Sequence, residues 1–315
     1  MEFTKRLIKH LYGFVVSLSP NIEIFFRQLY WKNISNLKEI VDKKALKNDL
    51  TDFTKVIEFL KSLLCENDIL IVHSSFTALN GVGKSPKQII NELINLVGKN
   101  GTLAMNSARI FSEEGKIEDI LDEKEINIAE YNLKKSKVWT GAIPLFMVRD
   151  SRSVISKFPL NPMVAIGNQA LNMMEKNIEG DNCSSCGPYS SWKYCTDRNA
   201  LVVGIGLDLT HSLTIMHVAE ENKNEWPIKN WFRKRKFKII DGDQQNIIEV
   251  NERRPKWGLL HFAERTLRKD LIKSGVLNSH EIDGFRIEYL RAKTLFDFLN
   301  SKNEKGYPYF KCKNL

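Results

Sequence analysis

The residues best suited to acid–base chemistry lie in the segment THSLTIMHVAEE. His217 and Glu220 are three residues apart, so on a helix they share one face. A histidine held by a carboxylate is the usual general base, because the imidazole pKa lies near neutrality. Glu220 or Glu221 would orient this imidazole or bind a substrate ammonium group. The alternative is an ordinary helical histidine beside solvated glutamates.

Two further histidines lie in chemically dense segments. His73 follows the apolar run from Ile69 to Val72 and so ends a predicted strand, where structural and chemical roles are equally open. His211 is the alternative base or a substrate contact. The other histidines, at positions 10, 261 and 280, lie outside such segments.

Three cysteines close together in the sequence raise a zinc alternative. They are Cys183, Cys186 and Cys195. A closed zinc site needs about four ligands, and no second C-x-x-C pair or paired-histidine motif follows, although His211 could complete the set. We therefore predict no metal. Cys186 is a candidate catalytic thiol, with a buried structural thiol as the alternative.

The stretch from Asp68 to Leu103 predicts the scaffold that positions these side chains. A β-branched apolar run, a loop with glycines, a helix and a second strand follow one another. Ser85 offers the helix N-cap and Pro86 suits the first helical position. Such a helix start is a ready anion site. A nucleotide-binding loop is the alternative, but Ala78 stands where its pattern needs a glycine.

Separated motifs in this chain resemble the aminoglycoside 3-N-acetyltransferase family, also called antibiotic N-acetyltransferases, and they occur in the family's order. VHSS, the loop, the helix and GTL are similar to the family's coenzyme-A-binding segment. TGAIP and a later AIG strand follow, and CGPYSSW is similar to the family's FGxxSP loop. The family's T-x-x-H-x-A-E signature is matched at Thr214, His217, Ala219 and Glu220.

The resemblance implies an α/β fold with a mixed central sheet and helices on both faces. Residues 1–50 themselves predict helices broken at Pro20, which would form an N-terminal extension. The acyltransferase domain is then expected over 51–315, with 225–315 matching only the family's variable end. The resemblance also implies acetyl-CoA or another acyl-CoA as cofactor. The expected coenzyme contacts are His73, Ser74, Ser75, Gly81, Gly83, Lys84 and Ser85. The expected catalytic residues are His217, Glu220 and Cys186, and the expected substrate contacts are Ser190, His211, Thr214 and Glu221.

The chain also departs from the family pattern. Leu145 stands where many members carry glutamate, and Phe158 stands where many carry the histidine before proline. Antibiotic-modifying members have a catalytic histidine shortly before the FGxxSP loop, whereas residues 181–186 contain none. We therefore expect the amine-binding part of the site to differ from theirs.

The size and net charge of the chain limit the classes of substrate to expect. The chain has 315 residues, 43% of them hydrophobic, which suits one large α/β domain or two small ones. A net charge of +9 favours anionic ligands and disfavours a polycation. With the resemblance, this predicts N-acetylation of a small amino sugar, nucleotide-linked as in surface-polysaccharide assembly. Aminoglycoside resistance is the alternative. The odd number of cysteines, five, fits a reducing cytoplasm.

A basic stretch from 229 to 238 raises nucleic-acid binding as an alternative function. Arginines and lysines with interleaved aromatics could bind nucleic acid. However, the alternation of Phe232, Phe237 and Ile239 with charges, followed by Asp241-Gly242-Asp243, predicts an exposed hairpin strand. We therefore predict no nucleic-acid partner.

The first 20 residues place basic side chains before an apolar octet. They lack a small-x-small cleavage site, so we predict a packing helix and no signal peptide. No apolar run approaches the roughly 20 residues of a membrane span. A peripheral membrane contact and a homo-oligomer stay open as alternatives.

Overall fold

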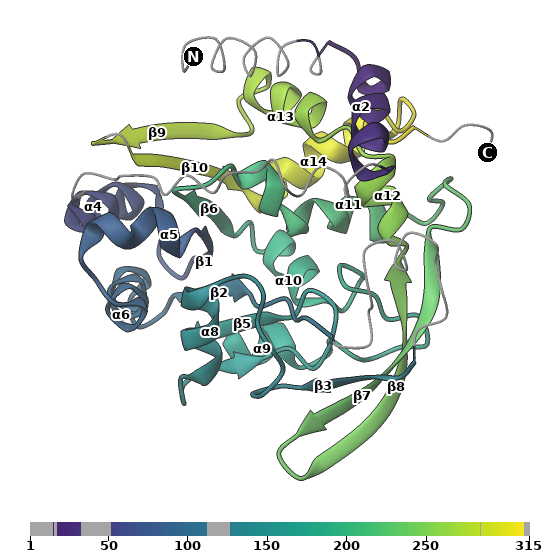
Figure 1. The fold of residues 1–315 in the computed structure, drawn as a ribbon. Helices are drawn as coiled ribbons and strands as arrows, with labels where there is room; N and C mark the ends of the chain where they lie inside the picture. Colours follow the sequence, from purple (N-terminus) through teal and green to yellow (C-terminus); the bar gives the residue numbers. More distant parts are fainter. Residues whose placement is uncertain (1–14, 16–17, 33–51, 112–126, 284, 312–315) are drawn as a thin grey trace.

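The computed structural model describes residues 15, 18–32, 52–111, 127–283 and 285–311, which form a large mixed sheet and a smaller one (Figure 1). The larger sheet has the order β4-β5-β2-β1-β6-β10-β9, with β1 parallel to β2 and β6 and the other pairings antiparallel. Its strands are β1 Ile69–Ser74, β2 Thr102–Asn106, β4 Val154–Ile155, β5 Met163–Gly167, β6 Leu201–Ile205, β9 Asn278–Ile282 and β10 Phe285–Arg291.

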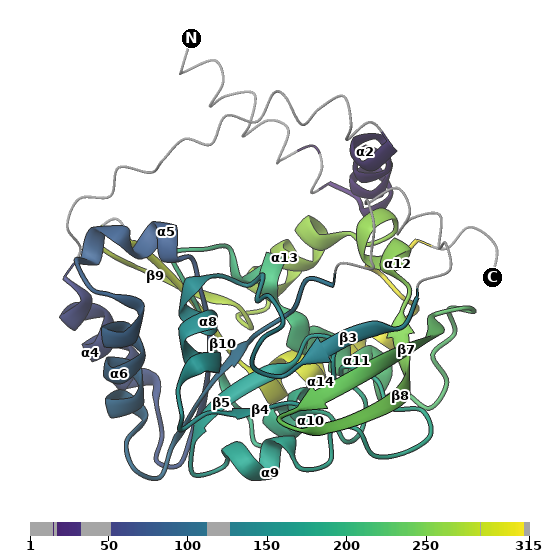
Figure 2. The same ribbon diagram turned by 60° about the horizontal axis from the view of Figure 1, so that its bottom comes forward.

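Helices cover both faces of this sheet, as the family resemblance implies (Figure 2). One layer consists of α4 Phe53–Leu63, α6 Pro86–Val97 and α8 Ala142–Arg149, and the other of α9 Ala170–Met174, α10 Ser191–Asp197 and α14 Ala292–Asn303. Strand alternation explains the two cores: Leu70 packs with the first layer, and Ile69 with the second. Each such fully buried aliphatic side chain contributes about 1.5–3 kcal/mol.

The helix after β1 forms as its sequence predicts. Ser85 is the N-cap of α6, and its side chain and that of Gln88 complete a capping box. The helix ends at Val97, because its C-cap Gly98 takes a positive φ of 70° and so stops the helix before Lys99.

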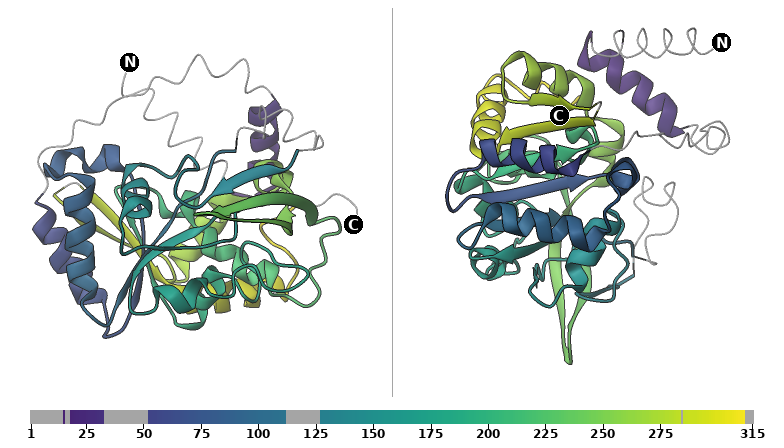
Figure 3. Two further views of the ribbon diagram at one scale, coloured as in Figure 1. Left: turned by 90° about the horizontal axis from the view of Figure 1, so that it is seen from below. Right: turned by 90° about the vertical axis from the view of Figure 1, so that its left-hand side faces the viewer.

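The smaller sheet contains the basic stretch. It consists of β3 Ala129–Asn132, β7 Phe232–Asp241 and β8 Gln244–Arg253. The predicted hairpin is confirmed, with Asp241 paired to Gln244 across a two-residue turn, and it extends away from the rest of the domain (Figure 3). Arg233 and Arg235 both bind Glu252. These two arginines of the basic stretch therefore serve the hairpin itself.

Part of the predicted N-terminal extension is described, and it packs on the C-terminal helices (Figure 1). α2 spans Pro20–Lys32, so Pro20 starts a helix, and the rest of residues 1–50 lies outside the described residues apart from 15, 18 and 19. Two separate helices, α12 Pro255–Leu260 and α13 Glu264–Lys273, follow the smaller sheet.

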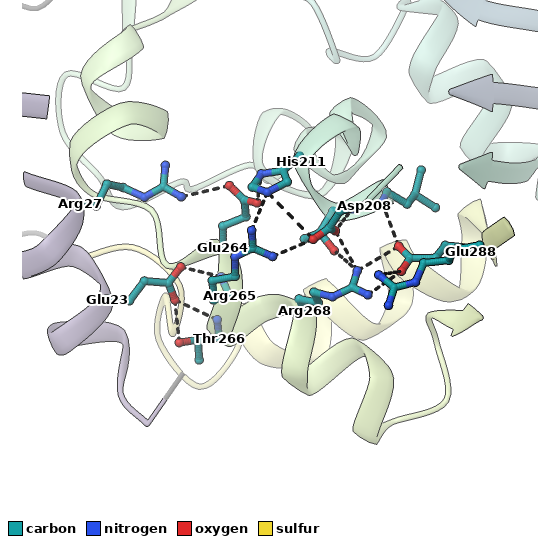
Figure 4. Close-up of polar contacts among 12 residues, drawn as sticks. Glu23, Arg27, Asp208, His211, Glu264, Arg265, Thr266, Arg268 and Glu288 are labelled. Atoms are coloured by element: carbon teal, nitrogen blue, oxygen red, sulfur yellow. Dashed lines mark hydrogen bonds and ion pairs between the residues drawn. The ribbon is translucent and has the colours of Figure 1, made fainter. Parts of the chain in front are cut away.

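A side chain of α2 caps the N-terminus of α13, although the two helices are far apart in the sequence (Figure 4). Both oxygens of the Glu23 carboxylate accept backbone N–H groups at the start of α13, from Arg265 at 2.5 Å and Thr266 at 2.8 Å. The N-cap residue Ala263 has no side chain that could do this. α2 therefore satisfies the N-terminus of α13. Within the described ranges, no helix has the length and apolarity needed to cross a membrane.

Candidate active site

A groove lies where the carboxyl ends of β1 and β2 meet, the usual ligand position on an open α/β sheet. It consists of two adjoining pockets of about 390 and 230 Å³. They share four lining residues: Asn161, His211, Ser212 and Thr214. The larger pocket reaches the end of β1, and the smaller reaches the end of β8.

The end of β1 brings His73 and Ser74 to the larger pocket. His73 is buried and stacks on the Trp192 ring with the centroids 6.4 Å apart. Burial lowers its pKa to about 4, so the ring is neutral at physiological pH. His73 Nε2 and Ser74 Oγ are buried without a hydrogen-bond partner. Because orphaned polar atoms are costly, these two atoms fit a site completed by a ligand.

The end of β2 supplies an amide that binds a hydroxyl in the middle of the groove. Asn106 Nδ2 donates to Thr214 Oγ1 at 3.0 Å. Thr140 Oγ1 in turn donates to the Asn106 carbonyl at 2.9 Å. Since Thr214 Oγ1 accepts from the amide, its own hydrogen is available to an oxygen atom of a ligand.

The predicted pair His217 and Glu220 lies in the smaller pocket's wall, at the junction of η4 Thr214–His217 and α11 Val218–Glu221. His217 Nδ1 is 2.7 Å from Glu220 Oε2. The same Nδ1 is 2.7 Å from Nη1 of Arg253, the last residue of β8. Burial, and then the Arg253 charge, lower the pKa of His217. The imidazole is therefore neutral at physiological pH, as a general base must be.

Glu221 and Cys186 lie behind this wall. The Glu221 carboxylate accepts the Cys186 backbone N–H at 2.7 Å, and burial raises the Glu221 pKa to about 7. Cys186 is fully buried, and burial raises its thiol pKa, so it is a poor proton acceptor. This burial favours a structural thiol, and the catalytic role of Cys186 stays a prediction. Glu221 likewise holds the loop, and it does not line either pocket.

His211 lines both pockets and contacts a carboxylate from α13. Its Nδ1 lies against Glu264 Oε1, and its Nε2 is 2.6 Å from Arg265 Nη2 (Figure 4). Arg27 of α2 donates to the other Glu264 oxygen at 3.0 Å. Half of the His211 side chain is exposed, so it can contact a ligand.

Other predicted residues lie away from the groove walls. Gly81, Gly83, Lys84 and Ser85 line neither pocket: Lys84 binds Glu92 at 2.6 Å, and Ser85 caps α6. Their role toward a coenzyme stays a prediction.

Ser190 is the N-cap of α10, and its hydroxyl donates to the Gly187 carbonyl at 2.7 Å. It belongs to a separate pocket with Cys183 and Tyr189. Phe158, noted above as a departure from the family pattern, is buried in the core. Among the described residues, no three His, Cys, Asp or Glu side chains gather as metal ligands.

Three residues of the groove have no motif in the sequence. Asn106, Arg253 and Glu264 come from β2, β8 and α13, far apart along the chain. The sequence alternation predicts the β7-β8 hairpin but not where the last residue of β8 lies in the fold. Only the tertiary fold brings these side chains to His217 and His211.

Fold and groove together define an α/β protein with a carboxylate–histidine pair at the carboxyl edge of a mixed sheet. The sequence profile described as aminoglycoside 3-N-acetyltransferase matches residues 71–303. The chain therefore belongs to the aminoglycoside 3-N-acetyltransferase family, as its motifs suggested. The match extends well past residue 225, into the part expected to be variable. A search of curated protein sequences gave no match.

Solved structures share the fold. The structure "AAC-IIIb binary with CoASH" has a TM-score of 0.67 and 17% identity, covering 83% of this chain and 98% of that chain. Aminoglycoside acetyltransferase AAC(3)-Xa has a TM-score of 0.66 and 17% identity, covering 81% and 93%. "AAC-VIa bound to Sisomicin" has a TM-score of 0.64 and 16% identity, covering 81% and 97%. The expected mixed α/β fold is confirmed.

Proposed function

We propose that this protein is an acyl-coenzyme-A-dependent N-acetyltransferase that acts on an amino sugar, with His217 as the general base. The observation that carries the proposal is the 2.7 Å contact between His217 Nδ1 and Glu220 Oε2 in the groove wall. With Nδ1 bound to Glu220, the other ring nitrogen can take a proton from an acceptor amine. Glu220 then stabilises the imidazolium.

The residues at the end of β1 fit the coenzyme, whose presence in the AAC-IIIb structure supports this cofactor. His73 Nε2 and Ser74 Oγ would hold polar groups of its pantetheine arm, because both atoms are buried without a partner. An acyl-coenzyme A thioester, when bound, supplies the electrophilic carbonyl carbon. The Thr214 hydroxyl, set by Asn106, would donate to an oxygen that gains negative charge.

The charges in the groove support a nucleotide-linked amino sugar over an aminoglycoside. Among the described residues that line the two pockets, Glu264 is the one carboxylate, and it is already bound to Arg27 and His211. A polycation would find no unpaired acid there, whereas a phosphate would find Arg253. The aminoglycoside alternative is supported by the family itself and by the sisomicin in AAC-VIa.

A thiol-release assay with acetyl-CoA tests the proposal. The acceptors are glucosamine, glucosamine 1-phosphate, UDP-glucosamine and sisomicin, each at low and high salt. We expect the phosphate-bearing sugars to be used about tenfold better than sisomicin, with the gap narrowing at high salt. Equal or faster release with sisomicin would support the resistance activity instead. No release above hydrolysis with any of these amines would contradict the proposed reaction.

A further inference from the structure

Two side chains compete for one nitrogen atom in the groove wall. His217 Nδ1 lies 2.7 Å from Glu220 Oε2 and 2.7 Å from Arg253 Nη1. Arg253 Nη1 is 3.7 Å from the same Glu220 oxygen. A neutral imidazole nitrogen either donates or accepts, so Nδ1 can satisfy only one of its two neighbours at a time.

The two choices give opposite chemistry at Nε2. If Nδ1 carries the proton, it donates to Glu220, and Nε2 has the lone pair that a general base needs. If Nδ1 accepts from Arg253, which is always protonated, the ring proton is on Nε2, which then has no lone pair to accept a proton from the substrate amine. Arg253 therefore favours the unproductive tautomer.

Arg253 is placed where a ligand could draw it away. Both Arg253 and Gly258 line the smaller pocket, and about a fifth of the Arg253 side chain is exposed. Glu220, its carboxylate neighbour, is only 4% exposed. A guanidinium is a planar fork that binds phosphate through two parallel hydrogen bonds. A phosphate in this pocket would bind Arg253 more strongly than a neutral imidazole nitrogen does.

We infer that Arg253 is a specificity-determining residue that keeps His217 in its unproductive tautomer until the phosphate of an amino-sugar acceptor binds its guanidinium. This inference rests on the proposed function and deepens it. When the phosphate binds, Nε2 releases its proton to water in the groove and Nδ1 takes a proton from water, so the net charge of the ring does not change. The acceptor class is a phosphate-linked amino sugar, either a sugar phosphate or a nucleotide-linked sugar.

Nitrogen NMR of the full-length protein labelled with ¹⁵N-histidine tests the tautomer without turnover. The His217→Gln variant assigns the His217 signals. We expect Nε2–H in the free protein and with N-acetylglucosamine, and Nδ1–H after addition of N-acetylglucosamine 1-phosphate. UDP-N-acetylglucosamine in a parallel sample distinguishes a monoester from a nucleotide-linked diphosphate. An unchanged tautomer at saturating concentrations of both phosphate ligands would overturn the inference.

Kinetics of Arg253→Gln provide the second test. Relief of the competition should raise kcat for glucosamine severalfold, while the preference for glucosamine 1-phosphate falls by about tenfold, the scale of one charge-assisted hydrogen bond. Lys236→Gln is the matched control, because it removes the same charge from an exposed position on the same hairpin. It should leave the preference unchanged.

The two ways of failing are distinguishable. Coenzyme A release with equal kcat/KM for glucosamine and glucosamine 1-phosphate would overturn the role of Arg253 and leave the acyltransferase in place. An equal loss of preference in Lys236→Gln would also overturn it, because net charge would then explain the effect. Arg253→Lys keeps the charge without the fork, so it should recover only part of the preference.

Discussion

Arg27 Nη2 donates to Glu264 Oε2 at 3.0 Å, which joins the N-terminal extension to the wall of the groove. The same arginine donates to the carbonyl of Gly258, another lining residue. Glu264 in turn contacts His211 (Figure 4). α2 therefore contacts the wall of the smaller pocket, which the proposed function assigns to the acceptor.

Arg27→Ala should weaken acceptor binding and spare the coenzyme. Loss of the charge-assisted bonds removes about 1–2 kcal/mol of stability and lets Glu264 and His211 move. We expect the acceptor KM to rise severalfold while kcat and the coenzyme A Kd change little, as measured by steady-state kinetics and calorimetry. Lys55→Ala is the control. It removes an exposed ion pair between Lys55 of α4 and Asp283. An unchanged acceptor KM in Arg27→Ala would show that α2 does not influence acceptor binding.

His73 should make stability fall in mild acid. Its pKa is about 4 in the folded protein and near 6.5 unfolded, so below pH 6.5 the unfolded chain binds the extra proton. Stability from this group is present above pH 6.5 and is lost as the pH falls toward 4, by about 1.5 kcal/mol between pH 6.5 and 5. Urea unfolding at these two pH values measures it. His73→Gln should show a shallower loss, and an identical loss would contradict the burial of a neutral ring.

Cys186→Ala should separate the structural role from the catalytic one. Its thiol is buried and donates to the Thr214 carbonyl at 3.6 Å, so its removal costs about 1 kcal/mol of unfolding free energy. We expect kcat to stay within about threefold, far less than the loss that removal of a general base causes. A loss of a hundredfold or more in a variant that melts normally would restore Cys186 as the base.

The loop before α6 can be tested as a coenzyme contact by two substitutions at one position. Gly83 has a φ of 64°, which asparagine tolerates better than most residues. Gly83→Asn therefore tests the strain, and Gly83→Asp adds a negative charge. If this loop approaches a coenzyme phosphate, only the aspartate variant should lose stabilisation by coenzyme A in calorimetry. Equal coenzyme A binding by both variants would show that this loop does not contact a coenzyme phosphate.

Local sequence signals predicted the parts of this fold that local physics decides. The N-cap at Ser85 and the turn after Asp241 depend on neighbouring residues, so both were predicted correctly. The pair of His217 and Glu220 also lies within one turn of helix, and its contact was predicted.

Long-range contacts were not predictable in this way. Arg253 reaches His217 because β8 ends at the wall of the smaller pocket, and no pattern near Arg253 signals this. The cap of α13 by Glu23 joins residues more than 240 positions apart. The burial of Cys186 also depends on packing around Trp192 and the sheet, not on its own neighbours.

The central claim is that His217 removes the acceptor proton, and single-turnover coenzyme A release by His217→Ala tests it most directly. With acetyl-CoA and glucosamine 1-phosphate, we predict a loss of about 10²–10⁴-fold in rate, the usual scale for a missing general base. Coenzyme A affinity and the melting temperature should stay close to those of the unsubstituted protein. A rate within a few-fold of the unsubstituted protein, at full coenzyme occupancy, would contradict the account and place the base elsewhere, with His211 as the next position to substitute.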